Sequence, residues 1–179
     1  MPAAMAVSLL VGTVRTLAHY TQSPAAILAS MNQRMLGRSK DGFTTCLVLR
    51  LDPDGTATIS NAGHLAPYLN AQELPVENGL PLGLAAEAVY SESAFRLDAG
   101  QELTLLTDGI AEARSKSGEL FGFERTASIS ILSAEHIAAT AAAFGQQDDI
   151  TVLKVRRTPV PEPADERVDN TARLSPSAA

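Results

Sequence analysis

The sequence is poor in cysteine and in aromatic residues, and each shortage excludes a class of protein. Cys46 is the only cysteine among 179 residues, tryptophan is absent, and aromatic residues make up 4%. A single cysteine can form neither an internal disulfide nor a cysteine zinc cluster, which indicates a cytoplasmic protein kept in reducing conditions. With 45% hydrophobic residues and so few aromatics, the core of a single domain is expected to consist of Leu, Val, Ile and Ala.

An excess of positive charge and a long apolar run are also missing. The formal net charge is −6, so neither nucleic acid nor an anionic membrane surface is expected as the main partner. The longest apolar stretch, residues 2–14, is too short to cross a bilayer and lacks the basic leader of a secretory signal. We therefore interpret this stretch as a buried helix and expect no membrane insertion.

Hydrophobic periodicity predicts two helices followed by a series of strands. The helices are expected at 3–20 and 23–37, with Ser23 and Pro24 as N-cap and first residue of the second helix. The later elements are strands at 46–51, 56–61, 65–69, 87–95 and 102–107, a helix at 133–144 and a strand at 150–155. Turn residues between the first two strands predict an antiparallel hairpin. This order favours an α+β sandwich over a doubly wound nucleotide-binding fold.

The composition changes near the C-terminal end of the sequence. From residue 158 onward, prolines are scattered among charged residues and serines. Such a segment cannot bury enough apolar surface to offset the entropy lost on ordering. We therefore predict a folded domain at 1–157 and a disordered tail at 158–179.

Three aspartates lie where apolar strands begin or end, and they are candidates for metal binding. Asp108 follows the predicted strand 102–107, and Gly109 lets the backbone turn and a ligand approach. Asp148 and Asp149 precede the last strand, and two adjacent like charges are costly unless solvent or a cation relieves the repulsion. Carboxylate oxygens suit Mg²⁺ or Mn²⁺. Taken singly, however, a common Asp-Gly turn or a solvated loop explains each motif as well.

The other motifs point to structure more than to chemistry. His64 ends the second predicted strand in a turn, where a histidine is usually a structural hydrogen-bonding group, although acid–base or ligand roles stay open. The apolar stretch 79–84 has glycines near both ends and predicts a loop over the sheet edge. The sequence contains no serine nucleophile elbow, P-loop, dinucleotide-binding glycine pattern or HExxH motif.

Seven short motifs in a fixed order resemble those of a known family. They are Phe43-Thr44-Thr45, Asn61-Ala62-Gly63-His64, Gly79-Leu80-Pro81-Leu82-Gly83, Thr107-Asp108-Gly109, Glu112-Ala113, Phe121-Gly122 and Asp148-Asp149-Ile150-Thr151. Each motif is weak alone, but together they make residues 1–157 resemble the sporulation (SpoIIE-like) branch of the metal-dependent PPM serine/threonine phosphatases. The resemblance implies a partial α-β-β-α sandwich of antiparallel sheets flanked by helices, with a binuclear Mn²⁺ or Mg²⁺ centre at one end.

The resemblance also implies roles for individual residues. Asp108 and Asp148 match metal-binding aspartates of the family, so their side chains are expected to converge on one divalent cation. Asp149 and Gly109 are expected to support the site without serving as principal ligands. In the family a metal-bound water attacks phosphoserine or phosphothreonine directly, so no catalytic side chain is predicted. The implied partner is a phosphorylated regulatory protein, often of the anti-anti-sigma type.

The sequence departs from the family pattern at its N-terminal end. The family's first metal motif, an Asp-Gly step, should precede Pro2, and it is absent together with the strands before it. We therefore expect an N-terminally truncated domain with an incomplete metal site and unpaired sheet edges, and a sensor domain upstream of this chain. The stretch 123–144 is also short for the family, which predicts a fused or missing helix.

Three hypotheses about function follow. The first is a phosphoprotein phosphatase that requires Mn²⁺ or Mg²⁺. The second is a truncated, inactive pseudophosphatase that acts at most by binding a partner. The third is an unrelated α+β binding domain, for which the order of the motifs would have to be chance. Saturable Mn²⁺ binding would argue against an inactive remnant.

Overall fold

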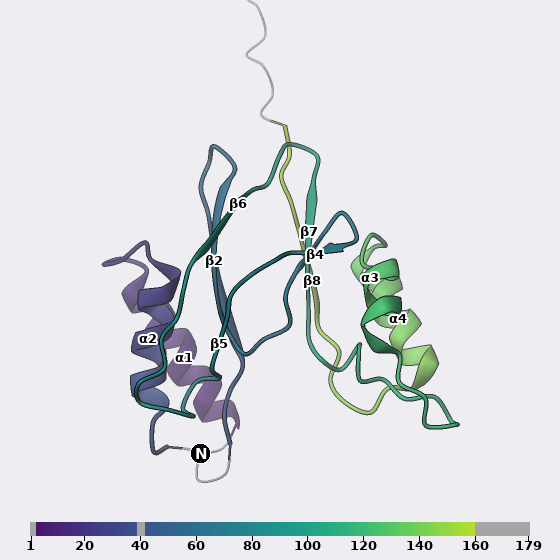
Figure 1. Cartoon of the computed structure of the whole chain (residues 1–179), viewed down its shortest axis with the longest axis horizontal. Helices are drawn as coiled ribbons and strands as arrows, with labels where there is room; N and C mark the ends of the chain where they lie inside the picture. Colours follow the sequence, from purple (N-terminus) through teal and green to yellow (C-terminus); the bar gives the residue numbers. More distant parts are fainter. Residues whose placement is uncertain (1–2, 39–41, 160–179) are drawn as a thin grey trace, which may run out of the picture.

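Two β-sheets face each other in the computed structural model, and each is covered on its outer side by a pair of helices (Figure 1). The structure describes residues 3–38 and 42–159. The first sheet and its helices comprise α1 (Ala3–Leu17), α2 (Pro24–Met35), β1 (Cys46–Leu51), β2 (Thr56–Ala62), β5 (Asn78–Gly79) and β6 (Ser93–Arg96). The second sheet and its helices comprise β3 (Tyr68–Leu69), β4 (Gln72–Glu73), β7 (Glu102–Leu106), α3 (Gly122–Ile129), α4 (Ala134–Gly145) and β8 (Val152–Arg156). The predicted α+β sandwich is confirmed.

The first sheet is built on the hairpin that its turn residues predict. β1 and β2 pair antiparallel in a register that places Leu49 opposite Ile59. Gly55 closes the turn with a φ of +93°, a conformation that residues with a side chain rarely adopt. β6 pairs antiparallel with the start of β2, and β5 pairs parallel with its end, a short pairing that the sequence did not predict. β2 is therefore the central strand, and Ile59 is fully buried.

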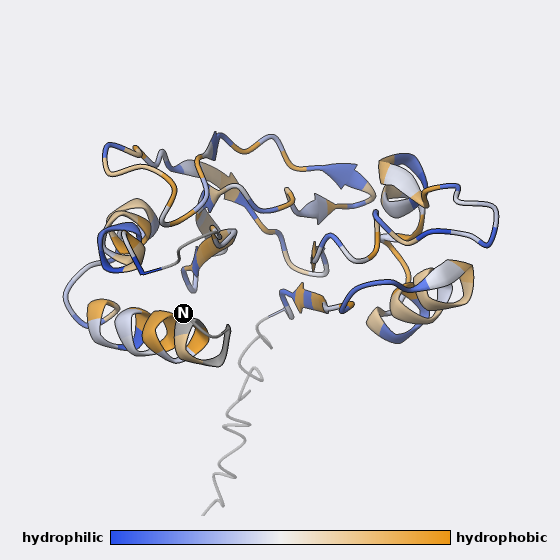
Figure 2. Cartoon of the chain, turned by 90° about the horizontal axis from the view of Figure 1, so that it is seen from below, coloured by the Kyte–Doolittle hydropathy of each residue, from blue (hydrophilic) through white to orange (hydrophobic). Residues whose placement is uncertain are grey.

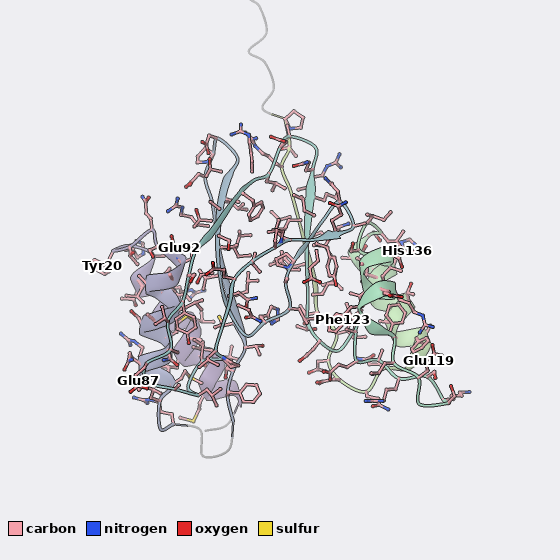
Figure 3. All side chains as sticks on the ribbon, in the orientation of Figure 1. Tyr20, Glu87, Glu92, Glu119, Phe123 and His136 are labelled. Carbon is pink, nitrogen blue, oxygen red and sulfur yellow. The ribbon has the colours of Figure 1, made fainter. Side chains whose placement is uncertain are left out.

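Helices α1 and α2 cover the outer face of the first sheet. As predicted, Ser23 caps α2, because its Oγ accepts a hydrogen bond of 3.1 Å from the Ala26 N–H. Glu92 ties this helix start to the sheet, since its carboxylate accepts hydrogen bonds from Ser23 Oγ and from the Ala25 N–H (Figure 3). The interface buries a cluster of apolar side chains: Ile27, Leu28, Met31, Met35, Ala62, Leu82 and Tyr90.

The second sheet is covered by α3 and α4, and α3 is absent from the sequence prediction. α3 is eight residues long and only Thr126 is buried on it, so it lacks the apolar stripe that predicts a helix. Neighbouring aromatic contacts hold it in place. Phe121 packs edge-on against Phe144 with 5.2 Å between ring centroids, and the Arg125 guanidinium lies 5.2 Å from the Phe144 centroid. Two separate helices, α3 and α4, occupy this stretch, so the expectation of a fused helix is wrong.

Several strands are shorter than their apolar patterns predict. The strand expected at 65–69 pairs only at Tyr68–Leu69, and the strand expected at 87–95 is reduced to β6. The residues before β6 are held by side chains instead of a strand ladder. Tyr90 is buried in the helix-covered cluster, and the Ser91 carbonyl accepts a hydrogen bond of 2.7 Å from Ser60 Oγ. Buried side chains therefore produced a strand-like pattern in an irregular segment.

Unpaired sheet edges are present, as expected, within the described residues. There β1 pairs as a strand with β2 alone, and β8 pairs with β7 alone. Leu51 of β1 and Leu153 of β8 are 42% and 55% exposed, and Figure 2 shows further apolar residues along α1.

Across the described ranges, every helix falls short of the length and apolar character that a membrane span requires. Residues 160–179 of the predicted disordered tail lie outside the described residues, so the tail and the domain boundary stay predictions.

Candidate metal centre

The pairing of β7 with β8 brings the two aspartate-containing loops to the same end of the second sheet. The strands are antiparallel, and Leu106, the last residue of β7, lies opposite Val152, the first residue of β8. The loop that leaves β7 and the loop that enters β8 must therefore be neighbours. This register explains how Asp108 and Asp148 come from adjoining loops although forty residues separate them (148 − 108).

Asp108 is held by a tight turn whose following residues are buried. The Ile110 N–H donates to the Thr107 carbonyl over 3.3 Å, and the Glu112 N–H donates to the Asp108 carbonyl over 2.9 Å. Ile110 is fully buried in the apolar cluster beneath α4, whereas Asp108 itself is exposed. A buried anchor thus presents an exposed carboxylate in a defined place.

Thr107 joins this turn to the loop that contains the other aspartates. Its N–H donates to the Thr151 carbonyl over 3.1 Å, and its Oγ1 accepts from the Thr151 N–H over 2.9 Å. The same hydroxyl donates to the Asp149 carbonyl over 3.3 Å. The sequence assigned no separate role to Thr107, and its only signal was a threonine immediately before an Asp-Gly step. Its hydrogen bonds show that it positions both loops.

Gly109 is required by the close approach of the two loops. A β-carbon at this position would lie 2.5 Å from the Asp149 carbonyl oxygen and 3.1 Å from its carbon. Only a residue without a side chain permits this contact. Gly109 therefore packs directly against the backbone of the Asp149 loop. This contact is a physical reason for the supporting role that the resemblance predicts for Gly109.

The three aspartates concentrate negative charge at this end of the sheet. Asp108, Asp148 and Asp149 are all exposed. Within residues 3–38 and 42–159, their carboxylates form no ion pair with a lysine, arginine or histidine. One Asp148 oxygen, Oδ1, accepts a hydrogen bond of 2.7 Å from the Asp149 N–H. Such an arrangement repels itself and favours a cation from solution.

His64 connects the first sheet to this end of the second. Asn61 fixes the His64 backbone from both sides, since its Nδ2 donates to the His64 carbonyl over 2.8 Å and its Oδ1 accepts from the His64 N–H over 2.9 Å. The ring nitrogen Nδ1 lies 3.2 Å from Thr45 Oγ1. Burial lowers the pKa of His64, and the Asp108 charge and a hydrogen bond with the Leu106 backbone partly oppose this. His64 is thus a hydrogen-bonding link beside Asp108, in agreement with its structural interpretation.

The donor set suits a hard divalent cation, although it is small. Carboxylate oxygens on rigid turns are the ligands that Mg²⁺ and Mn²⁺ prefer. In the part of the chain that the structure describes, no group of three or more His, Cys, Asp or Glu side chains is arranged to hold a metal ion. Asp108 and Asp148 are thus a partial ligand set, and their assignment to a metal stays a prediction.

A cavity of about 310 Å³ lies between the sheets next to these loops. Its lining comes from β1, from the ends of β7 and β8, and from His64, and it includes Cys46 and Thr107. Burial raises the pKa of the Cys46 thiol from 9.0 to about 11, and a hydrogen bond with the Leu47 backbone only partly opposes this. Cys46 should therefore be a poor nucleophile in the folded protein.

Alkylation of Cys46 is expected to be about 100-fold slower in the native protein than in urea at pH 8, because the thiolate fraction falls tenfold per pKa unit. Because folding raises this pKa, the neutral Cys46 thiol contributes to the free energy of unfolding. This contribution is fully present below pH 9.0 and is lost as the pH rises through about 11. Mass spectrometry after timed iodoacetamide treatment measures the rates. Equal rates in the native and unfolded protein would contradict the burial argument.

Comparison with known proteins identifies the family. A family profile described as Stage II sporulation protein E (SpoIIE) matches residues 1–158. A search among curated proteins found no significant match.

Solved structures share the fold at low sequence identity. The RsbU and RsbW domains of a Mycobacterium tuberculosis protein are 24% identical, with a TM-score of 0.65, over 89% of this chain and 49% of that chain. The SiaA-PP2C domain of Pseudomonas aeruginosa is 23% identical, with a TM-score of 0.69, over 84% and 66%. The phosphatase domain of SpoIIE from Bacillus subtilis, presoaked with Mn, is 20% identical, with a TM-score of 0.55, over 90% and 76%.

The chain spans about half of the first of these structures and about two thirds of the second. At such identities the structures show the fold, and the family profile, which covers most of the chain, shows the family. The chain belongs to the SpoIIE family, and its fold is that of the PP2C-type phosphatase domains.

Proposed function

We propose that this chain is a protein serine/threonine phosphatase domain that hydrolyses phosphoserine or phosphothreonine on a regulatory protein in the presence of Mn²⁺ or Mg²⁺. The observation that carries the proposal is the contact between the Asp108 turn and the Asp148–Asp149 loop in a member of the SpoIIE family. Family relatives support the choice of metal, since one structure is of SpoIIE presoaked with Mn and another is of RsbX in complex with magnesium.

The roles of the chain's own residues follow from their contacts. Asp108 and Asp148 would hold the metal, while Thr107 and Gly109 keep their loops together. Divalent cations, when bound, lower the pKa of water and offset charge on phosphoryl oxygens. No protein nucleophile is needed for this reaction, and the partly buried, protonated Cys46 thiol is not suited to be one. The exposed aspartates leave the phosphate of a large protein substrate free to reach the loops.

Phosphate release is expected from a phosphoserine peptide in Mn²⁺ and is expected to disappear when a chelator is added. Initial rates with the peptide and with p-nitrophenyl phosphate measure the reaction, and the same chain in chelator is the control. Hydrolysis that persists unchanged in chelator would contradict a metal-dependent mechanism.

A binding domain without activity is the second candidate, because the described residues supply fewer than three clustered metal-binding side chains. Calorimetry with Mn²⁺ separates the two. A phosphatase should bind Mn²⁺ saturably at micromolar concentrations, whereas a domain that only binds a partner should not. Saturable binding of the metal without any phosphate release would reject the phosphatase and leave the chain as a metal-binding relative.

A further inference from the structure

A second pocket, of about 440 Å³, also has His64 in its lining. Strands of both sheets and the start of α3 contribute to it, and its lining residues include Tyr68, Glu73, Asn78 and Phe123. His64 lines this pocket as well as the cavity beside Thr107. The Asp108 carboxylate interacts electrostatically with the His64 ring. The pocket is therefore adjacent to the candidate metal centre, and its volume is in the range that holds a small ligand or one side chain.

Two polar side chains of this pocket, Tyr68 and Glu73, form no hydrogen bond or ion pair within the described part of the chain, whereas Asn61, His64 and Asn78 do. Tyr68 is only 3% exposed, yet its hydroxyl makes no hydrogen bond to any described residue. Glu73 lies directly opposite Tyr68 in the β3–β4 pairing, so both side chains are on one face of the sheet. The ion pairs of the described residues do not include Glu73. Among the described residues, only the Tyr90 hydroxyl is a buried side-chain polar atom without a partner, so the Tyr68 hydroxyl is open to solvent in the pocket and is available to a ligand.

The charge of the pocket selects the kind of ligand. Glu73 supplies a negative charge, and no lysine or arginine is among the lining residues. Burial, and then the Glu73 charge, raises the pKa of Tyr68, so its hydroxyl keeps its proton. A phosphate group would be repelled here, whereas an ammonium or guanidinium group could donate to both oxygens.

Apolar side chains complete the lining and fit the stem of a long cationic residue. Leu65, Ala66 and Val76 line the pocket, and Phe123 is 60% exposed at its rim. Figure 3 shows Phe123 on the side of α3 that is nearer to the strands. Lysine and arginine bury their methylene groups on such surfaces and favour the faces of aromatic rings.

We propose that this pocket binds a lysine or arginine side chain of the phosphoprotein substrate, a few residues along the chain from the phosphorylated residue. Glu73 pairs with the cationic group and the Tyr68 hydroxyl accepts a hydrogen bond from it. The proposal rests on the proposed function, because it names the feature by which the same site recognises its substrate. An extended peptide advances about 3.3 Å per residue, so a nearby side chain can reach across His64 while the phosphate lies at the aspartate loops.

Binding without catalysis provides the first measurement. Fluorescent phosphoserine peptides carry arginine at a single position, from about four residues before to about four after the phosphoserine. Each is compared with the same peptide containing citrulline, which has a similar shape without the charge. In chelator, fluorescence anisotropy should show about 10-fold tighter binding of the arginine peptide at one position. Equal affinities at every position would overturn the proposal.

Variants then test the pocket itself. Glu73→Gln should remove the preference for arginine, Glu73→Lys should reverse it in favour of a glutamate peptide, and Tyr68→Phe should weaken it by a smaller factor. Glu77→Gln is the matched control, because Glu77 lies outside this pocket on the same stretch of chain, and it should retain the full preference. A preference that survives Glu73→Gln would place the cation elsewhere.

Hydrolysis of p-nitrophenyl phosphate in Mn²⁺ separates this proposal from the proposed function, since this substrate has no peptide to bind. Wild-type protein that prefers the arginine peptide but hydrolyses nothing supports the pocket and rejects the phosphatase. Wild-type protein that hydrolyses p-nitrophenyl phosphate but shows no arginine preference supports the phosphatase and rejects the pocket.

Discussion

Replacing Asp108 or Asp148 by asparagine is expected to lower manganese-dependent phosphate release by about 100-fold or more. Losing a charged metal ligand removes several kcal/mol of transition-state stabilisation, and each factor of ten in rate corresponds to about 1.4 kcal/mol. Asparagine is the suitable replacement because it keeps the Oδ1 acceptor that Asp148 offers to the Asp149 N–H. Initial rates across a Mn²⁺ titration measure the effect, and a higher Mn²⁺ requirement should accompany it.

The matched control for these variants is Asp98→Asn. Asp98 precedes β7 and so lies at the opposite end of this strand from Asp108, and its ion pair with Arg96 is exposed. Exposed ion pairs contribute little, so both stability and activity should be close to those of the wild type. Phosphate release by Asp108→Asn at the wild-type rate would show that Asp108 does not bind the catalytic metal.

Replacing Gly109 by alanine is expected to impair both stability and activity. The added β-carbon would lie 2.5 Å from the Asp149 carbonyl oxygen, so the Asp108 turn and the Asp149 loop must move apart. Overpacking of this kind costs about 1–3 kcal/mol. A shift of roughly 1 Å in a reacting group can lower the rate by about 100-fold. Urea unfolding measures the first effect, and initial rates in Mn²⁺ measure the second.

Gly12→Ala in α1 is the control for this substitution. A β-carbon at position 12 would meet nothing within 4 Å, and alanine stabilises a helix interior by up to about 1 kcal/mol relative to glycine. This variant should be as active as the wild type and slightly more stable. If Gly109→Ala is destabilised yet fully active, the close contact of the two loops serves folding alone.

The fold could be predicted in outline because its main signals are local. The turn residues before Thr56 produced the β1–β2 hairpin, and the Ser23 cap marked the start of α2. Helix α3 and the short strands β4 and β5 could not be predicted, and β3 is shorter than the strand expected at 65–69. α3 buries only Thr126 and depends on Phe121, Phe144 and Arg125 for its place, and two-residue strands exist only because a longer strand lies beside them.

The sequence by itself determined the family, the fold class and the aspartates that are candidate metal ligands. A carboxylate at the end of an apolar strand is visible in a short stretch of sequence, and so is the order of such motifs. Only the tertiary structure decided how these residues meet. The β7–β8 register brings the loops together, Thr107 and Gly109 join them, His64 links them to the first sheet, and Tyr68 and Glu73 form a pocket beside them. Each of these contacts joins segments far apart in the chain, so it depends on sheet pairing and packing, which no short stretch of sequence specifies.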